Sequence, residues 1–478
     1  MRLLPLLFPL LALPSLATLW RGLPHVRETL RDLDVLWFSV GLAGVATLVA
    51  LALGLLLSWA AVEGGVGRGL EALLLLPYLI PPFVVGMGIL FSLEGLGVRG
   101  TGAPGILLAW TVHYTPLAYV LLRPQVEAAH RLQTVGRVHG LKGARALQAF
   151  LPPFAPALVV AGGTLYLAFL GNFGIPAVLG LPERVYLLST LAYARLLSPL
   201  SADPLGQAAA VAVLLGVGAL PALLAARPPE LEPTPPLPNP YRPWTRWAFT
   251  LYAALALGLA VGGLLREALL NPYRGGWDPA FPALLALPLV QKGLLNSLAL
   301  ALGGTALLLL GTALLRPWPL LLRRARQVLD LNYLLPGTLL ALGLILLLGG
   351  TPLYGSPALL LLAYLLHFAA LALRALETGV RVEGGVLSAR VHGLPPLRSW
   401  LRVGYPLLRP SFFTGAFLIL PLAFSEITLS AILYAPGNET VGVVALSLLN
   451  GGLYREAAAL GLILAGLGSL ALLGRKAW

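Results

Sequence analysis

Twelve long apolar segments recur along the chain, and each is long enough to cross a bilayer as a helix, which needs roughly 20 mostly apolar residues. They lie near residues 3–20, 36–61, 72–93, 104–122, 155–178, 204–226, 246–265, 293–315, 331–350, 356–373, 410–433 and 453–474. Strand-length alternation of apolar and polar residues is absent, and helices satisfy their own backbone groups in lipid. The sequence therefore predicts an all-α integral membrane protein with about twelve transmembrane helices.

The composition agrees with a membrane protein. Only 11% of the residues are charged and 58% are hydrophobic, whereas a soluble domain carries about 25% charged residues. The net charge of +13 does not indicate nucleic-acid binding, because the cations lie in the loops between apolar segments, where they set topology. The chain has no cysteine, which excludes disulfides, thiolate metal sites and a cysteine nucleophile.

The positions of Lys and Arg predict the orientation of the chain. If the N-terminus is cytoplasmic and the loops alternate, most of the 32 Lys and Arg residues fall inside, as the positive-inside rule requires. Both termini are then cytoplasmic. The first apolar run, Leu3–Trp20, could instead be a cleaved signal peptide. Only Arg2 precedes it and no clear Ala-x-Ala site follows, so we interpret it as a retained span.

An identical pentapeptide occurs twice, as Arg137–Leu141 and, 253 residues later, as Arg390–Leu394. Other residues recur at offsets of 254 or 255: His113 and His367, Tyr78 and Tyr333, Pro81 and Pro336, Pro152 and Pro406, and Pro156 and Pro410. A nearly constant offset over this length indicates an internal duplication. Each pentapeptide follows the fourth span of its half, so we expect two parallel repeats of six spans with a pathway at their interface.

The duplication divides the chain into five parts. We expect a first span and outer loop over residues 1–34, a first membrane domain over 35–226, a cytoplasmic linker over 227–245, a further span and outer loop over 246–291, and a second membrane domain over 292–474. Eight prolines lie within residues 227–244. They favour an extended polyproline II spacer over an ordinary loop.

The two longest basic cytoplasmic loops share an unusual pattern. Each has a helical stretch, a glycine (Gly140 or Gly393), a second helical stretch and then a proline (Pro152 or Pro406). Glycine can adopt positive φ and end a helix, and proline can begin the next helix. The sequence predicts a helix–turn–helix at the cytoplasmic face in both halves. Basic residues flank both turns, among them Lys142, Arg145, Arg398 and Arg402.

At these loops the chain resembles the permease subunits of binding-protein-dependent ABC importers, whose motif is Glu-Ala-Ala-x3-Gly followed by Leu-Pro. The resemblance runs from about residue 36 to 474 and implies two fused copies of the type-1 transmembrane domain. It departs from the motif at the acidic position, where Thr134 and Leu387 stand; Glu127 begins a literal Glu-Ala-Ala, but out of register with both repeats. The resemblance assigns ATPase coupling to Arg137, Val138, His139, Gly140, Lys142, Pro152, Arg390, Val391, His392, Gly393 and Pro406.

Two further stretches, Phe169–Pro182 and Phe424–Gly437, resemble the fifth-span sequences of ferric-iron permeases, with thiamine permeases next. The resemblance implies uptake of Fe³⁺, or of thiamine or another small solute, across the inner (plasma) membrane of a prokaryote. It also implies two ABC ATPase subunits and an extracytoplasmic solute-binding protein as partners. No cofactor is expected in this chain, because ATP would bind the partner ATPase.

Four polar residues lie within apolar segments and are candidates for a translocation path. Polar and ionisable residues inside the membrane are functional hypotheses by default. The alternative for each is structural hydrogen bonding between helices. They form two pairs at an offset of 254, His113 with His367 and Asn172 with Glu426. A Gly-x3-Gly pair, Gly258 and Gly262, favours ordinary close helix packing.

Missing motifs narrow the function. The chain has no Gly-x4-Gly-Lys-Ser/Thr, so ATP must be hydrolysed elsewhere, and no clustered metal ligands occur. We expect a transport subunit and no enzyme. A secondary transporter, also commonly six plus six spans, would carry its basic signature between the second and third spans. Here the loop Val62–Leu70 holds one cation, Arg68. A membrane-embedded enzyme would need a catalytic constellation, and none is found.

Overall fold

The computed structural model describes residues 8–140, 143–225, 243–271, 275–316, 318–377 and 380–470. Within these ranges the backbone is helical, and the only β-type pairing is an isolated bridge between Leu270 and Trp277. Among the described residues the all-α fold predicted from the sequence is therefore confirmed.

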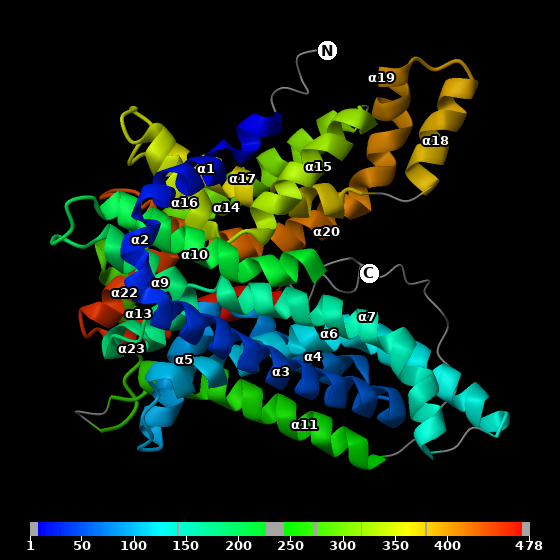
Figure 1. Ribbon diagram of the computed structural model, residues 1–478, viewed down its shortest axis with the longest axis horizontal. Helices are drawn as coiled ribbons and strands as arrows, with labels where there is room; N and C mark the ends of the chain where they lie inside the picture. Colours follow the sequence, from blue (N-terminus) through cyan, green and yellow to red (C-terminus); the bar gives the residue numbers. More distant parts are fainter. Residues whose placement is uncertain are drawn as a thin grey trace.

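The helices of residues 8–225 are α1 (Phe8–Gly22), η2 (Leu23–His25), α2 (Val26–Thr29), η3 (Leu30–Asp32), α3 (Leu33–Gly64), α4 (Arg68–Leu79), α5 (Pro82–Gly95), α6 (Gly102–Val138), α7 (Gly143–Leu170), α8 (Gly174–Leu179), η4 (Leu181–Glu183), α9 (Leu188–Leu196) and α10 (Pro204–Ala225). They form the blue to green part of Figure 1.

The helices of residues 243–470 are α11 (Pro243–Leu257), the π-helical turn η5 (Gly258–Gly262), α12 (Gly263–Leu269), α13 (Phe281–Ala286), α14 (Pro288–Leu315), α15 (Pro319–Leu334), α16 (Gly337–Leu348), α17 (Pro357–Ala375), α18 (Val380–Val391), α19 (Pro396–Ser399), the π-helical turn η6 (Trp400–Gly404), α20 (Tyr405–Phe424), α21 (Thr428–Ile432), α22 (Val441–Asn450) and α23 (Tyr454–Leu470). Pro243 begins α11, whereas most of the expected linker 227–245 lies outside the described residues.

Seven helical segments among the described residues are long and apolar enough to cross a membrane, and the number rises to nine if two bent helix pairs each count as one span. The seven are Leu33–Gly64, Gly102–His130, Pro204–Ala222, Thr245–Leu269, Pro288–Leu315, Pro357–Ala375 and Pro396–Ile432. The chain is therefore a multi-pass membrane protein. Three other expected spans correspond to shorter helices: α1 has 15 residues, α23 has 17, and the described apolar part of α7 is Phe154–Leu170.

The expected spans 72–93 and 331–350 are not straight. Gly69–Leu79 and Pro82–Gly95 meet at 96°, and Val328–Leu334 and Gly337–Leu348 meet at 112°. Pro81 and Pro336 lie at the two bends. Proline lacks the amide proton that would continue the helical hydrogen bonds, and it disfavours helical backbone in the residue before it. A hydropathy average over such a segment does not register the break.

At Gly343 of α16 and at Gly88 of α5, a helix from a distant part of the sequence packs closely against the glycine. α1 packs on α16 and α10, while α12 and η5 pack on α5, and α12 also packs on α23. An added Cβ at Gly343 would overlap the Pro14 carbonyl, and one at Gly88 would overlap the Ala260 carbonyl. The two glycines are 255 residues apart. Thr18 Oγ1 also donates to the Leu339 carbonyl at 2.7 Å, so α1 is fixed to the later part of the chain.

Candidate functional site

The two proline breaks have nearly the same backbone. Pro81 has φ −53° and ψ 139°, and Pro336 has φ −52° and ψ 133°. Each proline precedes the first residue of the next helix and accepts one of its first free amides, from Val84 at 2.9 Å and from Leu339 at 3.0 Å. Helices broken at corresponding positions are the arrangement by which membrane transporters build sites near the bilayer midplane.

Two further interruptions occur where α7 gives way to α8 and where α20 gives way to α21. Asn172 and Glu426 lie at these points, and each side chain accepts a backbone amide three residues later. Asn172 Oδ1 accepts from Ile175 at 3.0 Å, and Glu426 Oε1 accepts from Leu429 at 2.8 Å. A side-chain oxygen that satisfies the first amides of a helix is a capping interaction. The symmetric pair is therefore joined by a common structural role.

Asn172 uses both ends of its buried amide. Trp110 Nε1 donates to Oδ1 at 3.3 Å, and Asn172 Nδ2 donates to the Tyr114 hydroxyl at 3.0 Å. Ser189 Oγ donates to the Asn172 carbonyl at 2.9 Å. These bonds link α6, α9 and the turn before α8, which is the interhelical bonding that the sequence left as the alternative to a path.

Glu426 is similarly held. Its second oxygen, Oε2, accepts from the Ser430 amide at 3.0 Å and from Ser430 Oγ at 3.1 Å. The Tyr364 hydroxyl lies 2.9 Å from Ser430 Oγ. Backbone amides at the start of α21 thus face the carboxyl group and satisfy both of its oxygens. The cap supplies polar partners that lipid lacks.

The two histidines pack against the helices that precede the proline breaks. The His113 ring centroid lies 5.5 Å from that of Tyr78, and the His367 centroid lies 5.6 Å from that of Tyr333; the interplanar angle is 38° in both pairs. His113 Nδ1 is 2.9 Å from the Pro77 carbonyl oxygen. His113 therefore makes the helix–helix hydrogen bond that was the alternative to lining a path.

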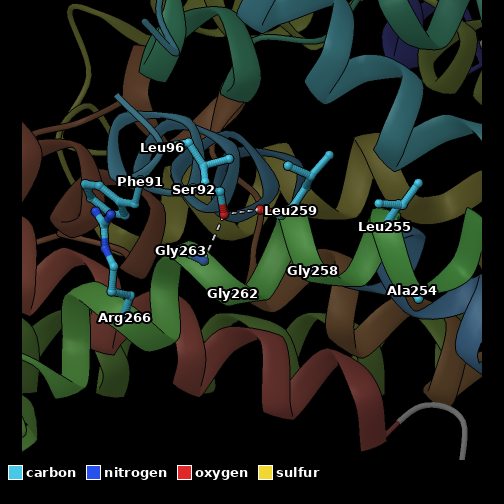
Figure 2. A pocket seen from close by; sticks show the side chains of 11 residues that line it. Phe91, Ser92, Leu96, Ala254, Leu255, Gly258, Leu259, Gly262, Gly263 and Arg266 are labelled. Atoms are coloured by element: carbon cyan, nitrogen blue, oxygen red, sulfur yellow. Dashed lines mark hydrogen bonds between the residues drawn. The ribbon is translucent and has the colours of Figure 1, made fainter. Parts of the chain in front are cut away.

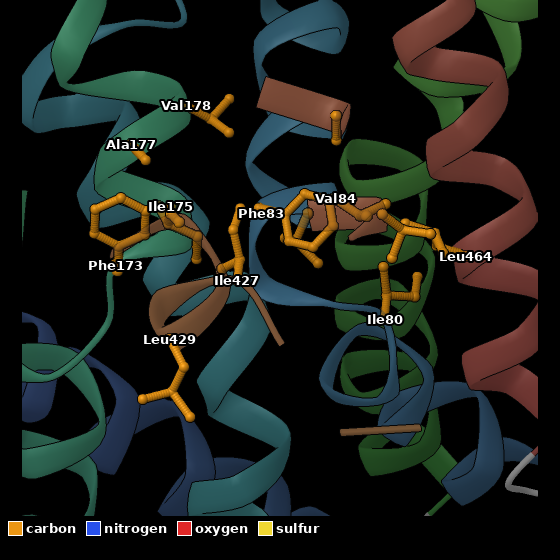
Figure 3. Packing of buried hydrophobic residues seen from close by; sticks show 14 of the residues in the cluster. Ile80, Phe83, Val84, Phe173, Ile175, Ala177, Val178, Ile427, Leu429 and Leu464 are labelled. Atoms are coloured by element: carbon orange, nitrogen blue, oxygen red, sulfur yellow. The ribbon is translucent and has the colours of Figure 1, made fainter. Parts of the chain in front are cut away.

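Apolar side chains from both parts of the chain, among residues 80–84, 173–178 and 427–429, pack together beside the interruptions at Pro81, Asn172 and Glu426 (Figure 3). Phe83 and Ile427 are buried, and an added Cβ at Gly174 would lie 3.1 Å from Phe83 Cβ and 3.3 Å from Ile427 Cγ2. An added Cβ at Gly442 would lie 2.9 Å from Ile427 Cβ. We call this contact of Phe83 and Ile427 with Gly174 and Gly442 the apolar junction. It is closely packed, and therefore closed, in this structure. Sequence reasoning missed Phe83 and Ile427, although each lies within two residues of a signal it had found, Pro81 and Glu426.

Both expected helix–turn–helix loops are present, and they project from the same end of the helix bundle, α6–α7 and α18–α19 at the right of Figure 1. Gly140 has φ +85° and Gly393 has φ +89°. In the second loop, Leu394 N–H donates to the Ala389 carbonyl and Gly393 N–H to the Arg390 carbonyl, both at 3.0 Å. This is a Schellman ending, which requires the left-handed conformation that glycine adopts without strain.

The two prolines that follow these loops differ: Pro406 is the second residue of α20, where a proline that begins the next helix was expected, whereas Pro152 does not begin a helix. Pro152 lies inside α7, which begins at Gly143. In the other loop Pro396 begins α19, and Pro406 follows the π-helical turn η6 within a continuing helix. The Tyr405 amide bonds to the Trp400 carbonyl, five residues back. The wider turn accommodates a residue that cannot donate a helical hydrogen bond.

The other residues assigned to coupling lie around these turns. Arg137 and Val138 are in the last turn of α6, His139 is exposed beside Gly140, and Lys142 lies outside the described residues. Arg390 and His392 are exposed on the second hairpin, and His392 Nδ1 lies 2.8 Å from the Ser388 carbonyl oxygen.

The second hairpin also exposes apolar side chains, of which Val391 had been assigned to ATPase coupling, whereas Leu397 and Leu401 had not been singled out from the sequence. Leu387, Val391, Leu397 and Leu401 are all exposed, Val391 by 77%. Leu387 and Val391 are four residues apart on α18, and therefore lie on one face of it. The sequence pattern that could have identified this apolar face is the four-residue spacing of Leu387 and Val391 within an otherwise basic loop. Apolar side chains exposed together on one face of a projecting helix are a candidate site of protein or membrane interaction.

No protein-family model, curated protein or solved structure matches this chain. Among the described residues, no group of three or more His, Asp or Glu side chains lies close enough together to hold a metal ion. The arrangement of helices and side chains is therefore the basis for a functional proposal.

Proposed function

We propose that this chain is the permease subunit of an ATP-driven ABC importer. Two separate ATPase subunits bind the hairpins α6–α7 and α18–α19, and an extracytoplasmic binding protein delivers the solute. The observation that carries the proposal is the pair of hairpins at one end of the bundle, each turning on a glycine with positive φ. Exposed Leu387 and Val391 on α18 supply the apolar surface that a docking partner would cover.

The proposal includes twelve spans arranged as two parallel repeats, with both termini in the cytoplasm of a prokaryotic cell and the inner membrane as its location. Matched contacts support the repeats. Besides the tyrosine–histidine pairs and the two caps, Leu188 N–H donates to Ser39 Oγ at 3.0 Å, and Val441 N–H donates to Ser297 Oγ at 2.9 Å. Each bond joins a late helix of its repeat, α9 or α22, to an early one, α3 or α14.

In this proposal, ATP binding moves the hairpins and rocks the two repeats, so that the apolar junction opens alternately to each side. Phe83 and Ile427 separate when it opens. The caps made by Asn172 and Glu426 satisfy the starts of α8 and α21 whichever way the repeats move, because each cap is local to its own turn. Glu426 supplies a negative charge beside the junction. This charge favours a cationic cargo, which both Fe³⁺ and the alternative, thiamine, would be.

A 6+6 secondary transporter is the second candidate, because helices broken at corresponding positions of two repeats are also typical of that class. The two candidates differ in their source of energy. In proteoliposomes, the chain alone under an ion gradient should fail to accumulate solute, and the chain with its ATPase should accumulate it only when ATP is present. Accumulation by the chain alone would reject the importer proposal.

Since the chain lacks cysteine, single cysteines can test the docking surface directly. Val391→Cys should crosslink to the ATPase subunit, and Leu353→Cys, exposed in the loop between α16 and α17, is the matched control. A crosslink from position 353 and none from position 391 would place the ATPase at the wrong end of the bundle.

A further inference from the structure

A groove of about 350 Å³ lies where the end of α5 meets α11, η5 and α12 (Figure 2). Its lining includes Phe91 and Leu96 on one side and Ala254, Gly258 and Gly262 on the other. An added Cβ at Gly258 or Gly262 would meet nothing within 4 Å. The close helix packing expected of this Gly-x3-Gly pair is therefore wrong for the described residues, and the two glycines form an open floor.

The floor is apolar although it contains a π-helical turn. A π turn displaces backbone groups from their usual helical partners. Ser92 takes up two of them, donating to the Leu259 carbonyl at 3.0 Å and accepting from the Gly263 amide at 2.8 Å. Both bonds are drawn in Figure 2. With these groups satisfied, the groove presents apolar surface along most of its length.

The position and length of the groove match one leaflet of a bilayer. Trp247, which is exposed, and Arg266 lie near opposite ends of the span formed by α11, η5 and α12. At 1.5 Å per residue they are roughly 28 Å apart, close to the roughly 30 Å hydrocarbon core. The groove runs from Ala254 to Arg266, roughly 18 Å along the helix and a little more than half of that core.

Arg266 lines the interfacial end of the groove, and carboxyl groups lie around it. The Arg266 guanidinium packs over Gly95, where an added Cβ would overlap Nη1, and Arg266 Nη2 lies 3.4 Å from Glu267 Oε2. Glu94 interacts electrostatically with both Glu267 and Arg266. Among the described residues, one cation, Arg266, lies with two carboxyl groups, Glu94 and Glu267, so their formal charges sum to a negative value. A lone anion would be repelled, whereas a headgroup with a phosphate and an ammonium offers a partner to each sign.

We propose that this groove binds one phospholipid with a zwitterionic amine headgroup, of the phosphatidylethanolamine type. One acyl chain lies over Gly258 and Gly262, the phosphate faces Arg266, and the ammonium faces Glu94 and Glu267. The lipid fills space that no helix of the described chain occupies. Its binding is independent of whether the protein is an ABC permease.

The test is native mass spectrometry of the full chain, purified from vesicles of equal parts phosphatidylethanolamine and phosphatidylglycerol. Wild-type protein should retain phosphatidylethanolamine selectively. Gly258→Leu with Gly262→Leu fills the groove and should lower the retained amount by about tenfold. Gly303→Leu with Gly311→Leu is the matched control, because an added Cβ at either α14 position also meets nothing within 4 Å. It should retain the lipid as wild type does.

Arg266→Gln separates the headgroup contact from the acyl contact. It should abolish the preference between the two lipids while leaving lipid in the groove. Leu substitution in a helix raises intrinsic helix propensity relative to Gly, and size-exclusion profiles would check folding; if the double variant does not fold, Gly258→Leu alone serves. Equal retention in wild-type and groove-filled protein, or retention in proportion to vesicle composition, would mean adventitious annular lipid only and overturn the proposal.

Discussion

Glu71 on α4 and Arg123 on α6 form an ion pair whose counterpart, between Arg326 on α15 and Glu377 after α17, has the charges exchanged. Positions 71 and 326 are 255 residues apart, and positions 123 and 377 are 254 apart. Each pair ties the helix that leads into a proline break to the helix that leads toward a projecting hairpin. The same two helices of each repeat are therefore joined by an ion pair, with the acidic and basic partners exchanged between the repeats.

Removing one partner of the first ion pair should lower the stability of the folded protein. Glu71 is buried and also accepts from the Tyr119 hydroxyl at 2.9 Å. Glu71→Ala leaves Arg123 and Tyr119 without this acceptor and should cost about 1–3 kcal/mol. Thermal unfolding of the purified protein in detergent measures the loss.

Exchanging the charges should recover most of that loss. Arg123 Nε also bonds to Glu127 at 3.0 Å, so the exchange needs Glu71→Arg, Arg123→Glu and Glu127→Arg together. The last change copies Arg381, the residue 254 positions after Glu127. If the triple variant unfolds at the same temperature as Glu71→Ala or a lower one, the two ion pairs are not interchangeable. Their matching positions in the repeats would then not imply equal contributions to stability.

The glycine turns should be intolerant of β-branched residues. Left-handed backbone costs a non-glycine residue about 1–2 kcal/mol, and Val at position 393 would have to adopt it. Gly393→Val should reduce solute-stimulated ATPase activity of the reconstituted complex while the amount of membrane protein is maintained. Gly384→Val, on the exposed helix α18 where an added Cβ meets nothing within 4 Å, is the control. Unchanged transport in Gly140→Val and Gly393→Val alike would contradict docking through these turns.

Charge and capping at Glu426 can be separated. Glu426→Gln keeps an acceptor for Leu429 but removes the charge, and should slow uptake of a cationic cargo by about tenfold, or roughly 1.4 kcal/mol of barrier. Glu426→Leu removes every acceptor for Leu429 and Ser430, so less folded protein should be recovered. The measurement is the initial uptake rate per folded transporter in proteoliposomes. Equal rates for wild type and Gln would leave Glu426 with the capping role alone.

The loop after α8 should loosen in acid. Hydrogen bonds from Arg99 and then Thr101 lower the pKa of Glu183 below its ordinary value of 4.5. A lowered carboxyl pKa means that the bonds contribute fully above pH 4.5 and are lost as pH falls through the lower folded value. Hydrogen exchange of residues 181–187, corrected for intrinsic rates, should rise over that range. Arg99→Gln should raise exchange at neutral pH and flatten the dependence; a wild-type profile in that variant would contradict this account.

Much of the local structure could be predicted because it follows from residue type. Gly140 and Gly393 turn because only glycine adopts positive φ freely, and the repeat placed His113 and His367 in matching surroundings. The bends at Pro81 and Pro336 were not predicted, because a hydropathy average measures composition and does not register a missing amide donor.

The closed junction could not be predicted for a different reason. Phe83 and Ile427 are apolar residues in a chain that is mostly apolar, so nothing in the sequence distinguishes residues that meet across the bundle from those that face lipid. For Glu426, both a path and a hydrogen-bonding role were open. The turn at residues 425–427 brings the Leu429 amide to its carboxylate, and that turn has no hydropathy signal.

The contact between α1 and α16 also imposes a delay on biosynthesis. The hydrogen bond from Thr18 to the Leu339 carbonyl cannot form until Leu339, 321 residues later, has been synthesised. At roughly 5–20 residues per second the ribosome needs about 15–65 s to reach that residue. Until Gly343 has been made, α1 lacks the surface of α16 on which it finally packs. The packing of α1 on α16 is therefore a late step in the folding of the chain. A bulky substitution at Gly343 should trap a nascent protein with α1 undocked, a substrate for membrane quality control before any transport begins.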